Sequence, residues 1–334
     1  MKVVVCQGEA IGGEPPREEL LALWREELAK IPQIDEVVFR DNFNYEQVEE
    51  IAGDCDALVG VWIKDNAYDD AFFERHPKLK YIATTAHGFG KIDREAAARH
   101  GVTFTNTVYG DMTIAQFAMA LLLDICHGIR VNDACYREAL GQHKSVHMGR
   151  GMRVKTRQIE LYEKTMGIIG LGSIGIWTAK MAAGFGMKVI SYSRHKKEGE
   201  QYGFIEQVSL DELFARSDVI SIHCPSTDET RGMIDRNAFS RMKDGVIIIN
   251  TARGDIIVEP DLVDALNSEK VYAAGLDVMC NEPLHENTPL TQCKNAIITP
   301  HIAWAPSEAR RRSISIAAQN LKNWADGNPT SVIN

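Results

Sequence analysis

Short apolar runs recur through this chain at regular intervals, and they constrain its fold more than any other feature. In the second half they are "TMGIIG" (165–170), "MKVISYS" (187–193), "DVISIHCP" (218–225), "GVIIINTA" (245–252), "YAAGLDVM" (272–279) and "NAIITPH" (295–301). Several are continuous, without an apolar–polar alternation, which indicates strands buried on both faces. Amphipathic stretches separate the runs, and this alternation predicts βαβ units in a parallel sheet with helices on both faces.

The N-terminal part carries a similar series, which starts with "KVVVC" (2–6) and a helical stretch over 16–30 and ends with "VTFTN" (102–106). Because 334 residues favour two domains over one, we expect an α/β chain with two doubly wound parallel-sheet domains and a cleft between them. An apolar helix over 112–126 and a polar stretch over 127–163 separate the two series. The tail "SEARRRSISIAAQNLKNWADG" (307–327) is helical in pattern, and we expect it to return to the first domain.

Charge and cysteine content narrow the class of protein. The net charge is −9 and the sequence pI about 5.6, so we expect no nucleic acid partner and no anionic membrane. Seven cysteines without a C-x-x-C pair favour reduced thiols in a cytoplasmic protein and argue against a disulfide framework or a zinc ribbon, and we expect no metal site. No signal peptide is visible, and the run "IAQFAMALLLDIC" (114–126) is too short to span a bilayer. The basic cluster 310–312 is interpreted as a solvated helix face.

The stretch "GIIGLGSIG" (167–175) has the G-x-G-x-x-G spacing of a dinucleotide-binding turn. In that motif Gly170 permits a tight turn, Gly172 lets the backbone approach a pyrophosphate, and Gly175 lets the helix pack against the strand. The helix that starts with Ser173 and Ile174 would point its free N–H groups at the anion. Because the motif lies between an apolar strand and a helical stretch, dinucleotide binding is favoured over a purely structural turn.

The next strand, "MKVISYS" (187–193), ends without the acid that usually accepts the ribose 2′-hydroxyl of NAD. That position is Ser193, and the basic residues Arg194, His195 and Lys196 follow it. A serine removes the repulsion that an acid exerts on a 2′-phosphate, while arginine can hold phosphate in a bidentate fork. A solvated polar turn is the alternative, but it leaves the missing acid unexplained. We therefore expect NADP(H) to be preferred, with NAD(H) also possible.

Three polar groups lie just past the ends of later strands in the same series. They are Arg253 in "NTARG", Glu282 in "NEP" and His301 in "TPH". Ligands of open α/β sheets bind beyond the carboxyl ends of strands, so a cation, an acid and an imidazole could converge there on one crevice. Any one of these residues alone would more often be a surface residue, but their shared placement favours a catalytic site.

Together the stretches "GIIGLGSIG", "NTARG", "GLDV" with "NEP", and "TPHIA" resemble the D-isomer-specific 2-hydroxyacid dehydrogenase family over nearly the whole chain. The resemblance implies a discontinuous, flavodoxin-like substrate-binding domain of residues 1–110 and 302–334. Residues 111–301, with the helix and arm of 111–163, would form a Rossmann nucleotide-binding domain. The implied activity is reduction of a small 2-keto acid to the D-2-hydroxy acid, and the reverse oxidation, as in glyoxylate and hydroxypyruvate reductases and glycerate dehydrogenases. A homodimer is also implied.

The resemblance assigns roles to the matching residues. Arg253 would bind the substrate carboxylate and polarise the carbonyl. His301 would be the general acid that protonates the ketone oxygen as hydride arrives, and Glu282 would favour its imidazolium form. Asp277 would orient the nicotinamide carboxamide. The other residues expected to line the cofactor are His223, Cys224, Pro225, Thr230, Thr251 and Ala252, besides Arg253 and His301.

In the N-terminal domain, "TTAHGFGKID" (84–93) is similar to a family loop whose backbone N–H groups hold the substrate carboxylate. This places His87, Gly88 and Phe89 at the substrate, although an ordinary strand-to-helix turn is the alternative. Trp304 could wall the substrate pocket or pack between domains. Glu163 stands where a glycine is common in the family, so the entry to the strand at 165 is expected to differ.

Two other functions share this sequence pattern. A regulator or scaffold of the same fold that senses NAD(P)H needs no catalysis, and a lack of turnover with every 2-keto acid would favour it. Formate dehydrogenase is a related enzyme, but Pro300 precedes His301 here, where those enzymes are expected to carry a glutamine in a different motif. The side chain of the substrate and the physiological direction are left open.

Overall fold

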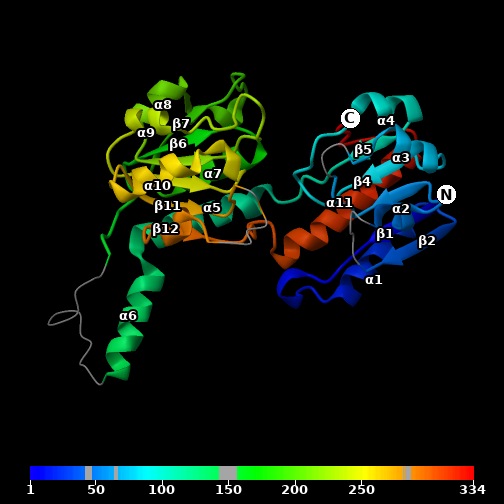
Figure 1. The fold of residues 1–334 in the computed structure, drawn as a ribbon, viewed down its shortest axis with the longest axis horizontal. Helices are drawn as coiled ribbons and strands as arrows, with labels where there is room; N and C mark the ends of the chain where they lie inside the picture. Colours follow the sequence, from blue (N-terminus) through cyan, green and yellow to red (C-terminus); the bar gives the residue numbers. More distant parts are fainter. Residues whose placement is uncertain (42–46, 64–66, 143–155, 281, 283–286) are drawn as a thin grey trace. The chain divides into compact units, whose positions relative to one another are not determined.

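The chain folds into two compact units, each built on one parallel β-sheet (Figure 1). The computed structural model describes residues 1–41, 47–63, 67–142, 156–280, 282 and 287–334. One unit comprises Met1–Gly110 with Trp304–Asn334, and the other comprises Asp111–Ala303. The expected α/β class with two doubly wound parallel sheets is confirmed.

The first unit has a five-stranded sheet in the order β2-β1-β3-β4-β5, which is the flavodoxin-like order that was expected. Its strands are β1 (Lys2–Cys6), β2 (Glu36–Arg40), β3 (Ala57–Val59), β4 (Tyr81–Ala83) and β5 (Thr103–Thr105). Its helices are the 3₁₀ turn η1 (Ile11–Gly13), α1 (Arg17–Leu28), α2 (Val48–Ala52), α3 (Asp70–Arg75), α4 (Arg94–His100) and α11 (Ser307–Ala325).

The tail helix α11 joins the core of this first unit (Figure 1). Ile314, Ala317 and Leu321 pack in one apolar cluster with Trp24 of α1 and Val5 of β1. The apolar positions of α11 recur at three- and four-residue intervals, so one face of the helix is buried against the sheet. A segment from the C-terminus therefore completes the N-terminal core.

The arginines of α11 are solvated in part, as expected, since Arg312 is exposed and the Arg311 side chain is 42% exposed, but each also has a partner within its own unit. The Arg311 side chain donates to Glu19 of α1 at 2.6 Å, and Arg312 donates to the Tyr109 carbonyl at 2.8 Å. Arg310 lies over the Trp304 ring, 5.1 Å from its centroid. The reason is that the helix packs along other elements of its unit, which brings partners to side chains that a helical pattern alone places in water.

The second unit has a seven-stranded sheet in the order β12-β11-β10-β9-β6-β7-β8, with the strand order reversing between β6 and β9 as in a Rossmann fold. Its strands are β6 (Thr165–Ile169), β7 (Lys188–Tyr192), β8 (Glu206–Gln207), β9 (Val219–Ile222), β10 (Val246–Asn250), β11 (Val271–Leu276) and β12 (Ala296–Ile298). Its helices are α5 (Asp111–His127), α6 (Ile129–Gly141), α7 (Ser173–Gly184), α8 (Leu210–Arg216), α9 (Arg236–Arg241), α10 (Glu259–Asn267) and the 3₁₀ turns η3 (Glu200–Tyr202), η4 (Gly254–Ile256) and η5 (Pro289–Gln292).

Both faces of the second sheet are buried, as the continuous apolar runs indicated. In β10, Ile248 belongs to one apolar cluster, whereas Ile247 and Ile249 belong to another. Successive side chains of a strand point to opposite faces, so these two clusters lie on the two sides of the sheet. The carboxyl ends of the strands consequently open at one rim, where the sequence places the polar groups.

The stretch over 127–163 contains a helix that was not expected. Gly128 has a left-handed φ of 54° and separates the buried helix α5 from α6, none of whose residues is buried. Residues 143–155 of the expected arm lie outside the described residues. In the described part of the chain no single helix is long and apolar enough to cross a membrane; α5 and α6, bent by 50° at their junction, reach that length and composition only when counted together.

Candidate active site

The glycine-rich turn joins β6 to α7, and two of its three glycines lie closely against neighbouring backbone. Gly170 has a left-handed φ of 93°, and a Cβ there would lie 2.6 Å from the Cys224 nitrogen. A Cβ on Gly175 would lie 2.2 Å from the Gly170 carbonyl oxygen. A Cβ on Gly172, the N-cap of α7, would meet nothing within 4 Å. The turn is therefore open where the first N–H groups of α7 point outward, and this geometry fits a pyrophosphate.

A short basic segment follows β7 and is fixed at both ends. The Ser193 hydroxyl oxygen accepts a hydrogen bond from the Leu171 N–H at 2.9 Å, which ties the end of β7 to the glycine turn. At the other end, the Lys197 N–H donates to the Gln207 side chain and the Lys197 carbonyl accepts from it, both at 2.7 Å. The side chains exposed between these anchors are Arg194, His195 and Lys196.

The segment after β9 lies against the glycine turn. The His223 imidazole Nε2 is 2.8 Å from the Ser221 hydroxyl, and burial lowers the pKa of His223 to about 3, so this ring is neutral at physiological pH. Burial raises the pKa of Cys224 to about 11, which keeps the thiol protonated and unreactive. The Thr230 hydroxyl donates to the Pro225 carbonyl at 2.7 Å, so it closes its own loop.

Arg253 lies in the turn after β10, and two neighbours that were not identified from the sequence set this turn. The buried Asn250 side chain accepts from the Ala252 N–H at 3.0 Å and donates to the Arg253 carbonyl at 2.9 Å. A Cβ on Gly254 would lie 2.1 Å from the Met279 carbonyl carbon, so glycine is needed where this turn meets the segment after β11. An asparagine at a strand end, which can satisfy turn backbone groups, was the available signal.

Thr251 lies in the same turn and has an unused hydroxyl. The residue is buried, and its Oγ1 is among the buried side-chain atoms of the described residues that have no hydrogen-bond partner. A buried hydroxyl without a partner costs free energy, which a bound ligand can recover. The expected role of Thr251 at the cofactor stays a prediction.

His301 lies in a sharp turn after β12, and Asp277 holds this turn. The His301 backbone is left-handed, with a φ of 54°, which is uncommon for a residue other than glycine or asparagine. Asp277 is fully buried directly after β11. Its Oδ1 accepts from the Thr299 hydroxyl at 2.6 Å and the Ile302 N–H at 2.9 Å, and its Oδ2 accepts from the Ala303 N–H at 2.8 Å. These bonds bracket His301 on both sides.

The expected contact of Asp277 with a nicotinamide carboxamide also stays a prediction. A carboxylate oxygen can accept two hydrogen bonds, and among the described residues the Asp277 Oδ2 accepts one, from the Ala303 N–H. The carboxylate therefore has capacity for one further donor. Ile302 and Ala303 belong to the second unit, to which Asp277 ties them.

Glu282 contacts His301 directly. Its Oε2 lies 2.7 Å from the imidazole Nδ1, and its Oε1 accepts from the Met279 N–H at 2.6 Å. Burial alone would raise the pKa of Glu282, but the hydrogen bonds from His301 and Met279 and the positive charges of His301 and Arg253 outweigh burial and lower it. The structure thus joins Glu282 to the Nδ1 side of His301, with the charge of Arg253 acting on the same carboxylate.

The predicted substrate loop belongs to the first unit and lies between β4 and α4. The Gly90 N–H donates to the Ile63 carbonyl at 2.6 Å, and the Asn106 side chain donates to the His87 carbonyl at 2.7 Å. The Phe89 side chain is exposed. Trp304 belongs to the same unit, where its ring lies under the Arg310 guanidinium. The roles of this loop and of Trp304 at a substrate stay predictions.

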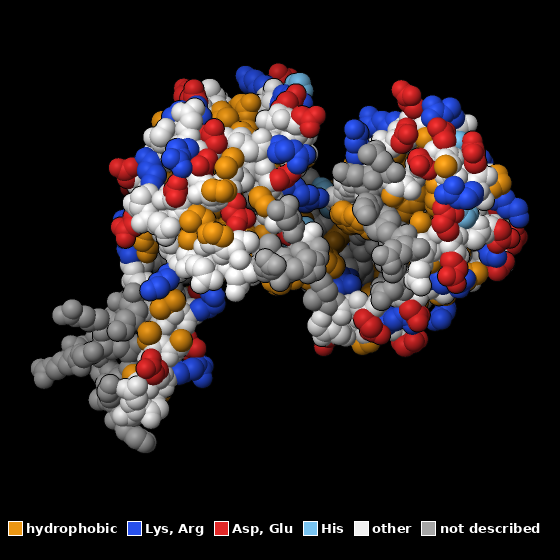
Figure 2. All heavy atoms as spheres, viewed as in Figure 1, with side chains coloured by type: hydrophobic (Ala, Val, Ile, Leu, Met, Phe, Trp, Pro, Cys, Tyr) orange, Lys and Arg blue, Asp and Glu red, His pale blue; other side chains and the backbone are white. Residues whose placement is uncertain are grey.

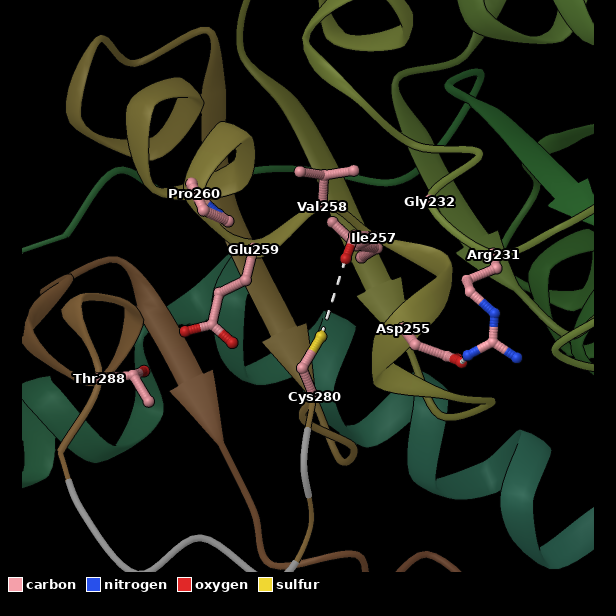
Figure 3. A pocket seen from close by; sticks show the side chains of 9 residues that line it. All are labelled: Arg231, Gly232, Asp255, Ile257, Val258, Glu259, Pro260, Cys280 and Thr288. Atoms are coloured by element: carbon pink, nitrogen blue, oxygen red, sulfur yellow. Dashed lines mark hydrogen bonds and ion pairs between the residues drawn. The ribbon is translucent and has the colours of Figure 1, made fainter. Parts of the chain in front are cut away.

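A separate pocket of about 550 Å³ opens in the second unit (Figure 3). Cys280 Sγ lies 3.9 Å from the Ile257 carbonyl oxygen at its centre, and Arg231 pairs with Asp255 at its edge. None of the predicted site residues lines this pocket. Among the described residues no group of three or more His, Cys, Asp or Glu side chains could hold a metal ion. The full lining is Arg231, Gly232, Asp255, Ile257, Val258, Glu259, Pro260, Cys280 and Thr288.

The fold and the rim of the second sheet define a nicotinamide-dependent oxidoreductase, and the chain belongs to the D-isomer-specific 2-hydroxyacid dehydrogenases. The model of the "D-isomer specific 2-hydroxyacid dehydrogenase, NAD binding domain" matches residues 133–303. A hydroxypyruvate reductase of Blautia hydrogenotrophica is 40% identical over 346 residues, covering 100% of both chains. A glyoxylate reductase of Aeropyrum pernix is 37% identical over 301 residues, covering 87% of this chain and 86% of the relative.

One solved structure extends the comparison to a bound cofactor. An acyclic imino acid reductase in complex with NADPH and D-Arg superposes with a TM-score of 0.81 and 26% sequence identity, covering 100% of both chains. The family expected from the motifs is confirmed, and so is an oxidoreductase with a nicotinamide cofactor.

Proposed function

We propose that this protein reduces a small 2-keto acid to the D-2-hydroxy acid, with a preference for NADPH over NADH, and catalyses the reverse oxidation. The observation that carries the proposal is the contact of 2.7 Å between His301 Nδ1 and Glu282 Oε2, beside the turn that bears Arg253. The names of the hydroxypyruvate and glyoxylate reductases support the substrate class. The NADPH complex of the imino acid reductase supports a fold that accepts the phosphorylated cofactor.

The residues of the second unit fit a dinucleotide. The open side of the glycine turn at Gly172 suits the pyrophosphate, and the fixed basic segment after Ser193 suits a 2′-phosphate. When bound, the nicotinamide supplies the hydride to the substrate carbonyl carbon. The residues proposed to line the cofactor are Gly170, Gly172, Ser173, Ile174, Gly175, Ser193, Arg194, His195, Lys196, His223, Cys224, Pro225, Thr230, Thr251, Ala252, Arg253, Asp277 and His301.

The chemistry on the keto acid falls to three side chains. Arg253 binds the substrate carboxylate through its planar fork and polarises the carbonyl. The His301 Nε2 donates a proton to the ketone oxygen during reduction and accepts it back during oxidation. Glu282, on the Nδ1 side of the ring, holds the imidazole in orientation and favours its protonated form. We assign substrate binding in the first unit to the loop with His87, Gly88 and Phe89, and to Trp304.

Initial rates of cofactor oxidation test this proposal. NADPH and NADH are compared with glyoxylate, hydroxypyruvate, pyruvate, phenylpyruvate and 3-phosphohydroxypyruvate. We expect turnover with glyoxylate or hydroxypyruvate and a higher kcat/KM with NADPH. No turnover with any acid would reject the catalytic proposal and favour a sensor of NAD(P)H. Faster turnover with NADH would reject the cofactor preference alone.

The variant His301→Asn tests the assigned proton donor. We expect turnover to fall by about 10²- to 10⁴-fold, the usual contribution of a positioned general acid. Cofactor affinity should be retained, because asparagine tolerates the left-handed backbone of this position. Turnover within about threefold of the unmodified protein would reject the role of His301 as proton donor.

A further inference from the structure

An ion pair joins the basic segment after β7 to the loop after β9. The Arg194 guanidinium Nη1 lies 2.8 Å from the Glu229 Oε2. The two side chains are 64% and 68% exposed, so they meet in solvent and neither is held by packing. No role for Glu229 was expected from the sequence, because its partner lies 35 residues away along the chain.

The backbone on both sides of this pair is anchored. Ser193 and Lys197 fix the segment that carries Arg194, through Leu171 and Gln207. On the other side, the loop that carries Glu229 is closed internally and tied to the turn after β10. Its internal bonds join the Thr230 hydroxyl to the Pro225 carbonyl and the Thr227 N–H, and its external bonds join Ser226 and Arg231 to Asp255. The ion pair is therefore a contact between two fixed segments, in which only the side chains need to move.

The position of the pair matters for the cofactor. Ser193 contacts the turn that suits the pyrophosphate, and it occupies the place of the acid that reads the ribose 2′-hydroxyl. A 2′-phosphate bound beside Ser193 would need the Arg194 guanidinium, which Glu229 already holds. The phosphate would also meet the negative charge of Glu229 at close range. An unphosphorylated 2′-hydroxyl meets neither obstacle and could donate a hydrogen bond to the Glu229 carboxylate.

We propose that Glu229 is a specificity-determining residue that opposes Arg194: it competes with the 2′-phosphate for the guanidinium and limits the preference for NADP(H). The proposal deepens the proposed function and rests on its assignment of the 2′-phosphate to Arg194. It accounts for a chain that lacks the usual acid yet supplies, from another loop, a carboxylate that pairs with Arg194. Both cofactors are then used, with a modest preference set by two opposed charges.

The test compares the dissociation constants of NADPH and NADH, measured by fluorescence titration of the purified full-length protein and of Glu229→Gln. The substitution keeps the size of the side chain and removes its charge. We expect the NADPH constant to fall by about three- to tenfold, since an exposed ion pair and one close like-charge contact are involved. The NADH constant should stay the same or rise by about twofold at most. The gain for NADPH should shrink in 0.5 M NaCl, because salt screens exposed charges.

Asp228→Asn is the matched control. Asp228 is the exposed neighbour of Glu229, and its replacement changes the net charge by the same amount without touching the ion pair. We expect no change in the NADPH-to-NADH ratio. Inhibition by adenosine 2′,5′-bisphosphate and by adenosine 5′-monophosphate isolates the same contact from the nicotinamide end: only the bisphosphate should bind more tightly to Glu229→Gln.

The outcomes separate this inference from the proposed function. An unchanged ratio of the two constants in Glu229→Gln, or an equal change in Asp228→Asn, overturns the role of Glu229. A preference of the unmodified protein for NADH, with Arg194→Gln leaving NADPH binding intact, overturns the assignment of the phosphate and with it this inference. A preference for NADH that Glu229→Gln reverses leaves the role of Glu229 standing and rejects only the predicted preference.

Discussion

At the residue scale, the negative charge of Glu282 should support proton transfer by the neighbouring His301. The pKa of the Glu282 carboxyl is lowered, because the hydrogen bonds from His301 and Met279 and the charge of Arg253 outweigh burial. It is thus ionised across the neutral range and can stabilise positive charge on the imidazole beside it. In Glu282→Gln this charge is lost, and the ring keeps only a neutral neighbour. We expect kcat for reduction to fall by about tenfold or more.

The lowered pKa of Glu282 also sets a pH dependence. The carboxylate keeps its charge as the pH falls into the usual range of a glutamate and loses it only below that range. The ratio of kcat between the unmodified protein and the variant should therefore stay constant from about pH 5 to 8. Profiles of kcat against pH in both directions, measured at saturating substrate, show this ratio. An unchanged kcat in both directions would mean that Glu282 only supports the fold.

The buried carboxylate of Asp277 should contribute to the stability of the fold. Three donors share its fully buried carboxylate, and an asparagine would present an NH₂ group to at least one backbone N–H. Because a buried unsatisfied donor costs about 1–3 kcal/mol, we expect Asp277→Asn to lower the free energy of unfolding by that amount. Urea unfolding measures it. Thr299→Val removes one donor and leaves the two backbone bonds in place, so it should cost less; an equal cost would contradict the account.

At the scale of elements, the connection from residue 156 into β6 contains a strained position. Glu163 has a left-handed φ of 61° where the N–H bonds the Gly186 carbonyl, and its side chain is exposed. A glycine is common at this place in the family, and glycine adopts such a φ without a steric cost. We expect Glu163→Gly to raise the free energy of unfolding by about 1 kcal/mol.

A second exposed glutamate with a left-handed backbone offers the same test of stability. Glu269, between α10 and β11, is also exposed and has a φ of 60°, so Glu269→Gly should stabilise the protein by a similar amount. Thermal and urea unfolding of both variants would show the effect. A loss of stability in both would mean that the added freedom of glycine in the unfolded chain outweighs the relief of strain.

Elements whose signal is local could be read from the sequence, and those that depend on distant partners could not. The strands β6, β9 and β10 are continuous apolar runs, and the glycine turn has fixed spacing, so both followed from neighbouring residues. The two-residue β8 exists only through its pairing with β7. The partners of the arginines of α11 were not foreseen for the same reason, since these partners lie on other elements.

The residues of the candidate site show the same difference between local signals and distant partners. The motifs placed Arg253, Glu282 and His301 at strand ends, where they are found. The clamp of Asp277 on the His301 turn needed coordinates, because its donors lie between 22 and 26 residues away in sequence. The Arg194 partner Glu229 was missed for this reason as well. A pattern of residue types proposes which groups react, whereas the groups that hold them are fixed by contacts across the sheet.

At the scale of the whole molecule, helix α6 contributes no residue to the hydrophobic core of its unit. None of its residues is buried, yet it carries exposed apolar side chains (Figure 2). Ile129, Tyr136 and Leu140 are separated by seven and four residues, so they lie on one face of the helix. An exposed apolar stripe of this kind is expected to be covered. A second copy of the chain, as in the homodimer expected for the family, would cover it.

Leu140→Lys tests this expectation, because a charge placed in an apolar contact must be desolvated when the contact forms. We expect the unmodified protein to be a dimer by sedimentation equilibrium and Leu140→Lys to dissociate at least about tenfold more readily. Glu138→Lys places the same charge on the opposite face of α6 and should leave the dimer intact. A monomeric unmodified protein would show that α6 has no partner of its own kind, and a dimer that survives Leu140→Lys would place the interface on another surface of the chain.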